Sequence, residues 1–264
     1  MFQIDYYAYS NRMVSIHPAE KFLFSFITML ICLAINSYAV SLAVILLMTG
    51  AVVLRAGIPW GLYLKLMALP AAFLLVGVAA IALSVSFSGQ AAGTFWGFSL
   101  AGVSVGVSAG GLALAGKIFL KSLAAACCLY FLALTTPMVD IISLLRKIKA
   151  PSLFMELMGL VYRFIFVMAE TAEKIYTSQS SRLGYVNLNR GYHSLGQLVS
   201  NLFVKSYHRS KMLFIALTSR CYNGEITVLE RNYSLSPGNI AVILLLDTGL
   251  VLFGIWEKWG GPAA

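Results

Sequence analysis

The sequence predicts an all-α integral membrane protein with about five transmembrane helices and long amphipathic helices on the cytoplasmic side. Hydrophobic residues make up 59% of the 264 residues, and charged residues only 11%. A soluble domain of ordinary composition has about 25% charged residues. Charge is also unevenly spread, because long stretches have none and one segment holds most of the basic residues. Such a chain has too little polar surface to cover a globule in water, so we expect it to lie in a bilayer.

The first apolar stretch is long enough for two short membrane helices. No charged residue occurs from Phe22 to Leu54, a stretch of 33 residues, whereas one span needs about 20. The polar pair Asn36-Ser37 interrupts the stretch near its middle. We therefore expect two helices joined by a tight turn at this pair.

A third apolar run extends from Leu62 to about Phe87, and only Lys65 interrupts it. The following residues, 88–111, are uncharged and rich in Gly and Ser, and three glycines are spaced by four: Gly102, Gly106 and Gly110. Small residues at this spacing are typical of a helix-packing face in membranes. An uncharged outer loop would have the same composition, so both interpretations stay open.

A fourth apolar run, from Leu112 to Thr135, carries Lys117 and Lys121. An ionisable residue within a span is a candidate functional site. Lysines near a helix end can also extend to the interface or pair with polar neighbours, which is the interpretation that we favour. The final apolar run, 239–256, carries one acid, Asp247.

We expect three regions: N-terminal transmembrane helices in residues 1–135, a cytoplasmic segment in 136–236 and a C-terminal transmembrane helix in 237–264. Residues 136–233 contain 12 of the 19 Lys and Arg residues. Because basic residues gather in cytoplasmic loops, a multi-pass protein with this segment and the N-terminus inside is predicted. The same rule accounts for the net charge of +9, which in a soluble protein would suggest nucleic acid; we expect no nucleic-acid partner.

The sequence offers no motif for a metal, a cofactor or catalysis. The four cysteines, Cys32, Cys127, Cys128 and Cys221, have no CxxC spacing, so a zinc or redox site has no support. No HExxH motif, no P-loop and no serine nucleophile with a nearby histidine occurs. We therefore expect a chain that is not an enzyme and that holds no cofactor or metal.

Three amphipathic helices are predicted in the cytoplasmic segment. They are expected at residues 136–150, at residues 152–183 and from near Ser194 up to Gly224. Thr136 is the expected cap of the first helix, with Pro137 in its first turn. The second and third are long enough to form extended rods.

The second and third of these helices end in the same way. Each reaches a Ser-Arg pair, and a glycine follows: Ser181-Arg182-Leu183-Gly184-Tyr185 and Ser219-Arg220-Cys221-Tyr222-Asn223-Gly224. An arginine at a helix C-terminus is favourable for the helix dipole, so capping repeated by chance is one interpretation. The other is a pair of equivalent tips for two equivalent acidic sockets, as on a dimer, because a guanidinium pairs bidentately with carboxylates.

Several further motifs, in order along the chain, carry a resemblance to a known family. They are Asp5-Tyr6-Tyr7-Ala8-Tyr9, His17-Pro18-Ala19-Glu20-Lys21, Leu134-Thr135-Thr136-Pro137 and Tyr162-Arg163-Phe164-Ile165-Phe166. With the two Ser-Arg tips, they cover the chain from Asp5 to about Glu230. The chain thereby resembles the transmembrane T component of energy-coupling factor (ECF) transporters, in its cobalt-type CbiQ branch.

This resemblance implies a subunit that hydrolyses nothing itself. A T component joins a substrate-capturing membrane subunit, here a cobalt-binding one, to two cytoplasmic ATPase subunits of the ABC type, and each arginine tip inserts into a groove of one ATPase. A small accessory membrane subunit is a further candidate partner. The implied location is the bacterial plasma (inner) membrane, with the N-terminus in the cytoplasm.

Carried over to this sequence, the resemblance makes Arg182 and Arg220 the ATPase-coupling residues. The flanking positions are Ser181, Leu183, Ser219 and Cys221. Cys221 stands where the family usually has Gly. Because Cys is small, we expect the tip still to fit its groove.

Two alternatives compete with this interpretation. A stand-alone secondary transporter or channel would need conduction residues in the membrane, for which the candidates are Asp247, Lys117 and Lys121, and no helix pair repeats in inverted form. The same subunit could also serve nickel, because clusters of His, Cys and carboxylates select a metal and this chain has none. Selectivity is therefore expected in a partner.

Overall fold

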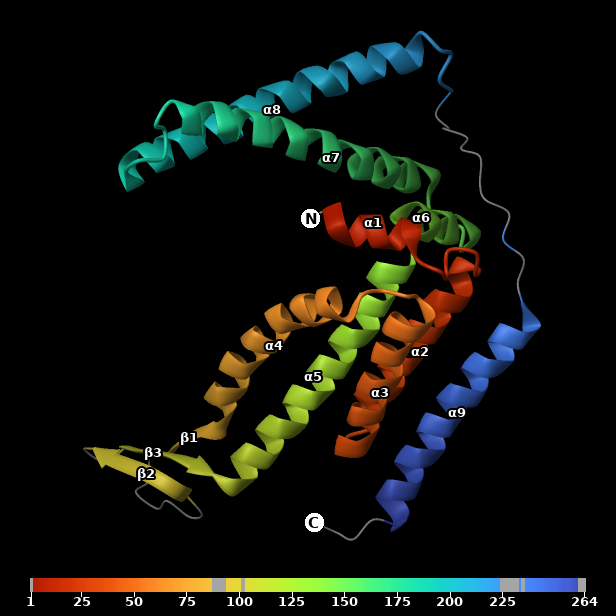
Figure 1. Ribbon diagram of the computed structural model, residues 1–264, viewed down its shortest axis with the longest axis vertical. Helices are drawn as coiled ribbons and strands as arrows, with labels where there is room; N and C mark the ends of the chain where they lie inside the picture. Colours follow the sequence, from red (N-terminus) through yellow and green to blue (C-terminus); the bar gives the residue numbers. More distant parts are fainter. Residues whose placement is uncertain (1, 87–93, 101–102, 224–232, 234–235, 261–264) are drawn as a thin grey trace. The chain divides into compact units, whose positions relative to one another are not determined.

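The computed structural model describes residues 2–86, 94–100, 103–223, 233 and 236–260. It divides into two compact units: the first unit comprises Met1–Pro137 and Asn232–Ala264, and the second unit Met138–Arg231. Each unit is built mainly of helices (Figure 1). Within the described residues, five helices are long and apolar enough to cross a membrane. The predicted class, an all-α integral membrane protein, is confirmed.

The first unit contains a helical bundle with one hairpin at the predicted place. Its helices are α1 (Phe2–Ser10), α2 (Pro18–Ala34), α3 (Tyr38–Gly50), the π-helical turn η1 (Ala51–Arg55), α4 (Trp60–Ala82), α5 (Ala109–Thr135) and α9 (Pro237–Gly260). The chain reverses between α2 and α3, where the Ser37 hydroxyl accepts a hydrogen bond of 3.2 Å from the Val40 N–H. Ser37 is therefore the cap that starts α3, and the predicted break at Asn36-Ser37 is confirmed.

A small antiparallel sheet interrupts the helices between α4 and α5. Its strands, β1 (Leu83–Ser86), β2 (Thr94–Leu100) and β3 (Val103–Ser108), lie in the order β1-β3-β2 (Figure 1). The glycine-spaced helix face does not form here, because Gly106 lies within β3, while Gly102 lies outside the described residues. Val103, Val105 and Val107 alternate with small residues, which is the period of a strand.

The set of helices that could span the membrane differs from the predicted set. They are Tyr38–Arg55, Trp60–Ile81, Gly110–Thr135, Ser152–Ser181 and Pro237–Glu257. The helix α2, which was expected to span, has 17 residues, whereas a span needs about 20. The helix at Ser152–Ser181 qualifies by length and composition, although the sequence placed it on the cytoplasmic side.

The core of the first unit is arranged around α5, which packs against α1, α2, α3 and α4. On α5, the side chains of Cys128, Phe131 and Leu134 are at most 1% exposed. The ring of Phe131 meets that of Phe24 from α2 edge to face, with centroids 5.5 Å apart, a favourable aromatic geometry. α5 is therefore the helix on which the others of this unit pack.

Two polar side chains close the C-terminal end of α5. The Lys21 ammonium donates a hydrogen bond of 3.0 Å to the Thr135 carbonyl, and the Asn11 amide lies 3.3 Å from both the Leu134 and the Thr135 carbonyls. All these groups are buried. Because the last carbonyls of a helix have no partner within it, and a cation there is favoured by the dipole, these contacts fix α1 and α2 to the end of α5.

Three polar contacts hold α9 at three levels of the bundle: Glu20 with Asn239, Thr28 with Asp247, and Ser37 with Glu257. The first two lie at 3.1 and 2.9 Å. Asp247 is only 4% exposed, so its carboxyl group faces the bundle and not the surroundings. α9 is therefore attached to the bundle by polar contacts in addition to the apolar packing of Leu250.

The two intramembrane lysines of α5 pair with the α2–α3 turn. The Lys121 ammonium donates a hydrogen bond of 2.7 Å to the Asn36 side-chain oxygen. The Lys117 ammonium lies 5.5 Å from the centroid of the Tyr38 ring, within the range of a cation–π interaction. Both lysines thus have the structural pairing that the sequence favoured.

Gly254 of α9 lies close to the α2–α3 hairpin. A Cβ atom placed there would lie 2.7 Å from Ile35 Cδ1 and 3.0 Å from Ile35 Cγ2. On the same helix, a Cβ at Gly249 would meet nothing within 4 Å. A larger side chain would therefore clash at residue 254 and would have room at residue 249.

We expect Gly254→Leu to lower the free energy of unfolding by about 1–3 kcal/mol, because an overpacked contact forces neighbouring side chains and backbone to shift. Thermal unfolding of the purified protein in detergent measures the effect. Gly249→Leu is the control and should unfold at the wild-type temperature. Equal transitions for both variants would show that α9 does not pack closely at residue 254.

Candidate functional site

The second unit consists of α6 (Met138–Lys147), α7 (Ser152–Ser181) and α8 (Leu188–Thr218). α7 and α8 are long helices that pack against each other (Figure 1). α8 begins at Leu188, six residues before the predicted start near Ser194. Ser194 lies within the helix, and its hydroxyl donates a hydrogen bond of 2.9 Å to the Gly184 carbonyl. The expected Thr136 cap of α6 is also wrong, since its buried hydroxyl has no hydrogen bond within the described residues.

The first arginine tip ends α7 with a tight reversal of the backbone. Arg182 follows the last helical residue with φ −97°, and Leu183 takes a left-handed conformation with φ 58°. The Gly184 N–H then donates to the Gln179 carbonyl at 2.9 Å. This bond, from a residue to the carbonyl five positions earlier, is the mark of a Schellman motif.

The second arginine tip ends α8 with the same reversal. Ser219 is the C-cap residue that follows the last helical residue, Thr218, and the Arg220 N–H donates to the Leu217 carbonyl at 3.0 Å. Cys221 is left-handed, with φ 58°, and the Tyr222 N–H donates to the same Leu217 carbonyl at 3.1 Å. Residue by residue, Arg220 and Cys221 therefore correspond to the arginine and leucine of the first tip.

The left-handed residue is not a glycine in either tip, which the sequence did not predict. It directly follows the arginine, at Leu183 and at Cys221. Gly184 serves a different purpose, because a Cβ there would lie 2.8 Å from the Ser194 hydroxyl and 2.9 Å from the Gln179 carbonyl. Gly224, the other expected stop, lies outside the described residues.

All six predicted site residues are exposed to solvent: Ser181, Arg182, Leu183, Ser219, Arg220 and Cys221. Within the part of the chain that the structure describes, neither arginine has an ion pair. Arg182 lines an open hollow of about 530 Å³ together with Arg190 and His193. Both guanidinium groups are thus available to an external acceptor.

Different contacts support the two tips. At the first, the Gln179 amide donates to the Ser194 carbonyl at 3.0 Å and accepts a bond of 2.7 Å from the Tyr185 hydroxyl. At the second, the Tyr222 hydroxyl donates to the Glu156 carboxylate at 2.6 Å, which connects the end of α8 to the start of α7. The tips therefore lie at opposite ends of α7, which is about 45 Å long at 1.5 Å per residue.

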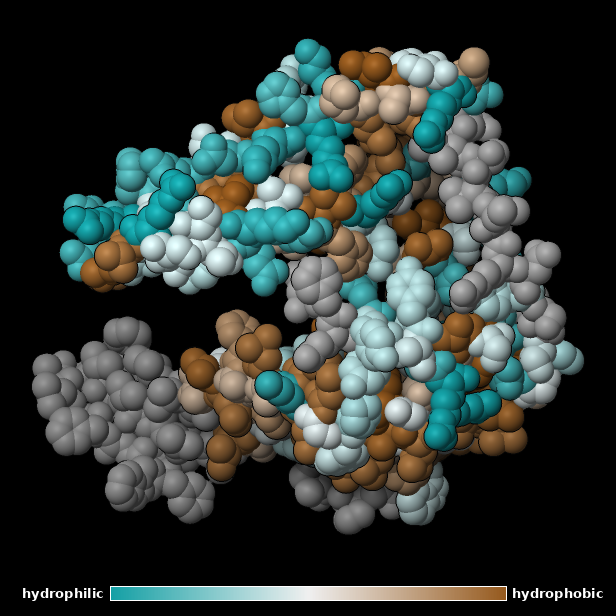
Figure 2. Space-filling model, turned by 45° about the horizontal axis from the view of Figure 1, so that its top comes forward, coloured by the Kyte–Doolittle hydropathy of each residue, from teal (hydrophilic) through white to brown (hydrophobic). Residues whose placement is uncertain are grey.

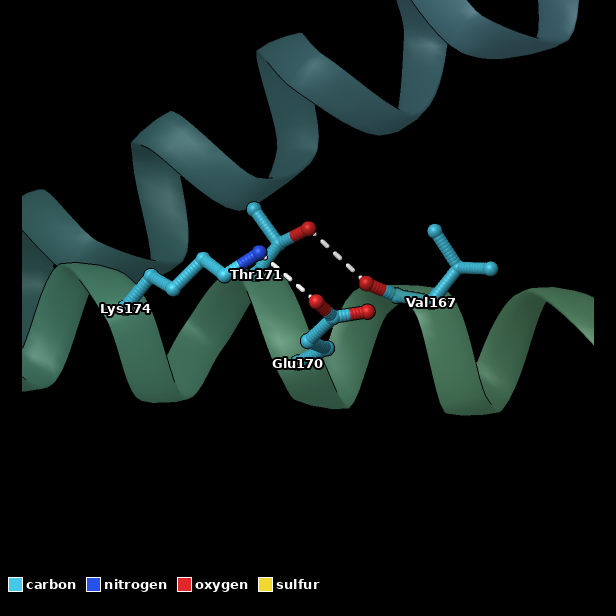
Figure 3. Close-up of polar contacts among 4 residues, drawn as sticks. All are labelled: Val167, Glu170, Thr171 and Lys174. Carbon is cyan, nitrogen blue, oxygen red and sulfur yellow. Dashed lines mark hydrogen bonds and ion pairs between the residues drawn. The ribbon is translucent and has the colours of Figure 1, made fainter.

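Polar side chains on α7 make contacts along the helix. Lys174 and Glu170 make an ion pair of 2.6 Å one turn apart, and beside it the Thr171 hydroxyl bonds the Val167 carbonyl at 2.8 Å (Figure 3). Both charged side chains are well exposed. An exposed pair of this kind contributes little to stability, because water and salt screen the two charges.

An apolar stripe runs along α8, and we call it the α8 stripe. Its members recur every three or four residues and are between 47% and 84% exposed: Leu188, Tyr192, Leu195, Val199 and Phe203. This spacing puts them on one face of the helix. α7 adds exposed Leu157, Val161 and Ile165, and Figure 2 shows hydrophobic side chains at the surface among the polar ones. So much exposed apolar surface marks a contact with a partner or a membrane.

Neither unit contains a recognisable metal centre within the described residues, since no three of their His, Cys, Asp and Glu side chains are placed to hold an ion. The cysteines are all free thiols. Cys32, Cys127 and Cys128 are at most 2% exposed, whereas Cys221 is exposed at the second tip.

We expect a maleimide to modify one thiol of the folded protein rapidly and all four after denaturation, because the reagent must reach the sulfur. Intact-mass measurement after a short exposure in detergent counts the additions. Cys221→Ser should remove the rapid addition. A second rapid addition to the folded wild type would contradict the burial of the other three cysteines.

A family model described as cobalt transport protein, CbiQ, matches residues 10–229. Three relatives illustrate the similarity. The cobalt transport protein CbiQ of Salmonella typhimurium is 28% identical over 84% of this chain and 97% of its own length. The energy-coupling factor transporter transmembrane protein EcfT of Ruminiclostridium cellulolyticum is 27% identical over 78% of each chain.

The third relative is a fused cobalt transport protein, CbiMQ, of Methanocorpusculum labreanum. It is 31% identical over 74% of this chain, which corresponds to 32% of the longer relative. The family match spans most of the residues, including both arginine tips and α2 to α8. The chain is a multi-pass membrane protein that belongs to the CbiQ family of cobalt transport proteins.

Proposed function

We propose that the chain is the energy-coupling subunit of an ATP-driven ECF-type importer for cobalt ions. In this role it would transmit the motion of two cytoplasmic ABC-type ATPase subunits to a substrate-binding membrane subunit. The observation that carries the proposal is the pair of exposed arginine tips with the same backbone geometry, Arg182 and Arg220. The site residues of the proposal are these two and their neighbours Ser181, Leu183, Ser219 and Cys221.

Two matching tips suit two copies of one partner. A symmetric pair of ATPase subunits presents the same groove twice, and a guanidinium fits a carboxylate in such a groove through two parallel hydrogen bonds. Each arginine is held at a helix end by a left-handed residue, Leu183 or Cys221. A push on a tip therefore acts on a rigid helix of 30 or 31 residues and not on a loose loop.

The α8 stripe supplies a surface through which the motion would reach the membrane partner. Its apolar side chains gain free energy when another apolar surface covers them, about 25 cal/mol per Å². The fused relative of Methanocorpusculum labreanum, whose name describes a cobalt transport protein CbiMQ, supports a second cobalt transport component as that partner. A cobalt-binding membrane subunit and a small accessory membrane subunit are the partners that we propose.

We further propose that residues 136–236 lie on the cytoplasmic side, with the N-terminus, although α7 is long and apolar enough to span. Charged groups in the bilayer centre are costly, and the second half of α7 carries exposed Glu170, Glu173 and Lys174 before the Arg182 tip. An orientation along the membrane surface or beneath a partner keeps these groups in water. ATP hydrolysis would take place in the partner subunits.

The alternative of a stand-alone transporter loses support from the contacts of its three candidate residues. Lys121 bonds Asn36, Lys117 lies over Tyr38, and Asp247 bonds Thr28. All three thus hold the bundle together. Nickel in place of cobalt stays open as a property of the membrane partner.

We expect the double variant Arg182→Glu, Arg220→Glu to lose co-purification with the ATPase subunits and ATP-driven cobalt uptake. The reason is that like charges would face each other in the groove, which typically costs several kcal/mol. Affinity purification from detergent and uptake into proteoliposomes measure the two effects. Lys205→Glu, Arg209→Glu, a reversal of the same size on the exposed surface of α8, is the matched control.

The thermal transition of the double variant should equal that of the wild type, since both arginines are exposed and unpaired within the described residues. Wild-type ATPase recovery and uptake by the double variant would refute the coupling role of the tips. An equal loss in the Lys205 and Arg209 control would show that overall charge, and not the tips, determines the assembly.

A further inference from the structure

The first unit contains an apolar cavity that the coupling function does not use. It has a volume of about 270 Å³ and lies among α2, α5, α9 and the α3–η1 segment. Its walls include Phe24, Leu47, Phe131, Val242 and Leu246. These side chains come from four helices, so the cavity is a feature of the packed bundle and not of one helix surface.

The cavity has a polar rim. Glu20, Lys21, Arg55 and Asn239 line it together, and a chain of hydrogen bonds joins Glu20, Asn239 and Arg55. The Glu20 carboxylate accepts the Asn239 amide at 3.1 Å, and the Asn239 side-chain oxygen lies 3.4 Å from the Arg55 guanidinium. Two cations and one carboxylate leave a net positive charge at this rim.

Arg55 is the cation that an external ligand can reach. Lys21 is 2% exposed and its ammonium bonds the Thr135 carbonyl, and Glu20 is 3% exposed with two donors on its carboxylate. Arg55, in contrast, is exposed. A guanidinium has five N–H donors, and the long contact with Asn239 uses one of them within the described residues.

A π-helical turn forms the wall beside Arg55. In η1, the Ala56 N–H donates to the Ala51 carbonyl, five residues earlier, at 3.0 Å. Such turns are rare and are frequent at functional sites. Ala51 and Arg55 both line the cavity, as does Gly50, where an added Cβ would meet nothing within 4 Å. The wall is therefore open where a side chain could have filled it.

We propose that this cavity binds an acyl chain of an anionic phospholipid, with the phosphate group on Arg55. The apolar walls match an acyl chain, which a membrane protein meets at high concentration. The exposed guanidinium at the rim matches a phosphate, with which Arg forms strong charge-assisted hydrogen bonds. A small polar solute would leave the apolar walls without a partner. A bound lipid would fill the space between α9 and the rest of the bundle.

Native mass spectrometry with defined lipids tests this site in the full-length protein. Delipidated protein in detergent is titrated with phosphatidylglycerol or with phosphatidylcholine of the same chains. We expect one phosphatidylglycerol to bind tightly, and phosphatidylcholine about tenfold more weakly, because its headgroup carries no net charge. Inorganic phosphate alone, as a separate arm, should neither bind at the same affinity nor raise the thermal transition.

Two pairs of variants locate the site. Gly50→Leu fills the cavity and should weaken phosphatidylglycerol binding by at least about tenfold; Gly77→Leu, at another helical glycine with nothing within 4 Å, should not. Arg55→Gln should remove the preference for phosphatidylglycerol while Lys65→Gln, at an exposed lysine of α4, keeps it. Thermal transitions in lipid-free detergent show that each variant is folded.

The proposal is overturned if Gly50→Leu and Gly77→Leu bind phosphatidylglycerol alike, or if both lipids bind the wild type equally. Stabilisation by inorganic phosphate that Gly50→Leu leaves intact would also overturn it, because the ligand would then be an anion and not a lipid. None of these results depends on the ATPase subunits, so this site and the proposed coupling function fail or hold separately.

Discussion

The bundle of the first unit depends on closing the C-terminal end of α5 inside protein. The last carbonyls of this helix are buried, and a buried carbonyl without a partner costs about 1–3 kcal/mol. Lys21 and Asn11 bond these carbonyls from two other elements. α5 is also the helix against which α1, α2, α3 and α4 pack. The same contacts that satisfy the helix end therefore fix α1 and α2 against it.

The hydrogen bonds at the end of α5 also connect two sequence motifs that carry the resemblance to the family. His17-Pro18-Ala19-Glu20-Lys21 and Leu134-Thr135-Thr136-Pro137 are more than a hundred residues apart, yet Lys21 and Thr135 share a hydrogen bond. Glu20 of the first motif bonds Asn239 of α9. One short motif thus organises both the end of α5 and the start of the last helix.

Local patterns predicted the helical class, the hairpin at Asn36-Ser37 and the place of both arginine tips. They could not predict contacts such as Thr28 with Asp247, because these depend on residues 219 positions apart. The strands β1, β2 and β3 were missed because an uncharged stretch rich in Gly, Ser and Val is compatible with helix, loop or strand. The start of α8 was placed near Ser194, where the apolar pattern begins, whereas the helix begins at Leu188.

The two tips are alike in backbone and not in sequence. The left-handed position is Leu183 in one and Cys221 in the other, each with φ 58°, a conformation that costs a non-glycine residue about 1–2 kcal/mol. The repeated Ser-Arg pattern identified the two arginines, but it assigned the end of each helix to the glycine that follows. If the tips are equivalent docking elements, the residues at these two left-handed positions have equivalent surroundings in a complex.

The rate of maleimide modification at both left-handed positions, with and without the ATPase subunits, tests this equivalence most directly. The wild type carries Cys221 at the second tip, and Leu183→Cys with Cys221→Ser places the one exposed thiol at the first. Docking of both tips predicts that the ATPase subunits slow modification at the two positions to a similar degree. Unchanged modification at either position in an intact complex would contradict the account.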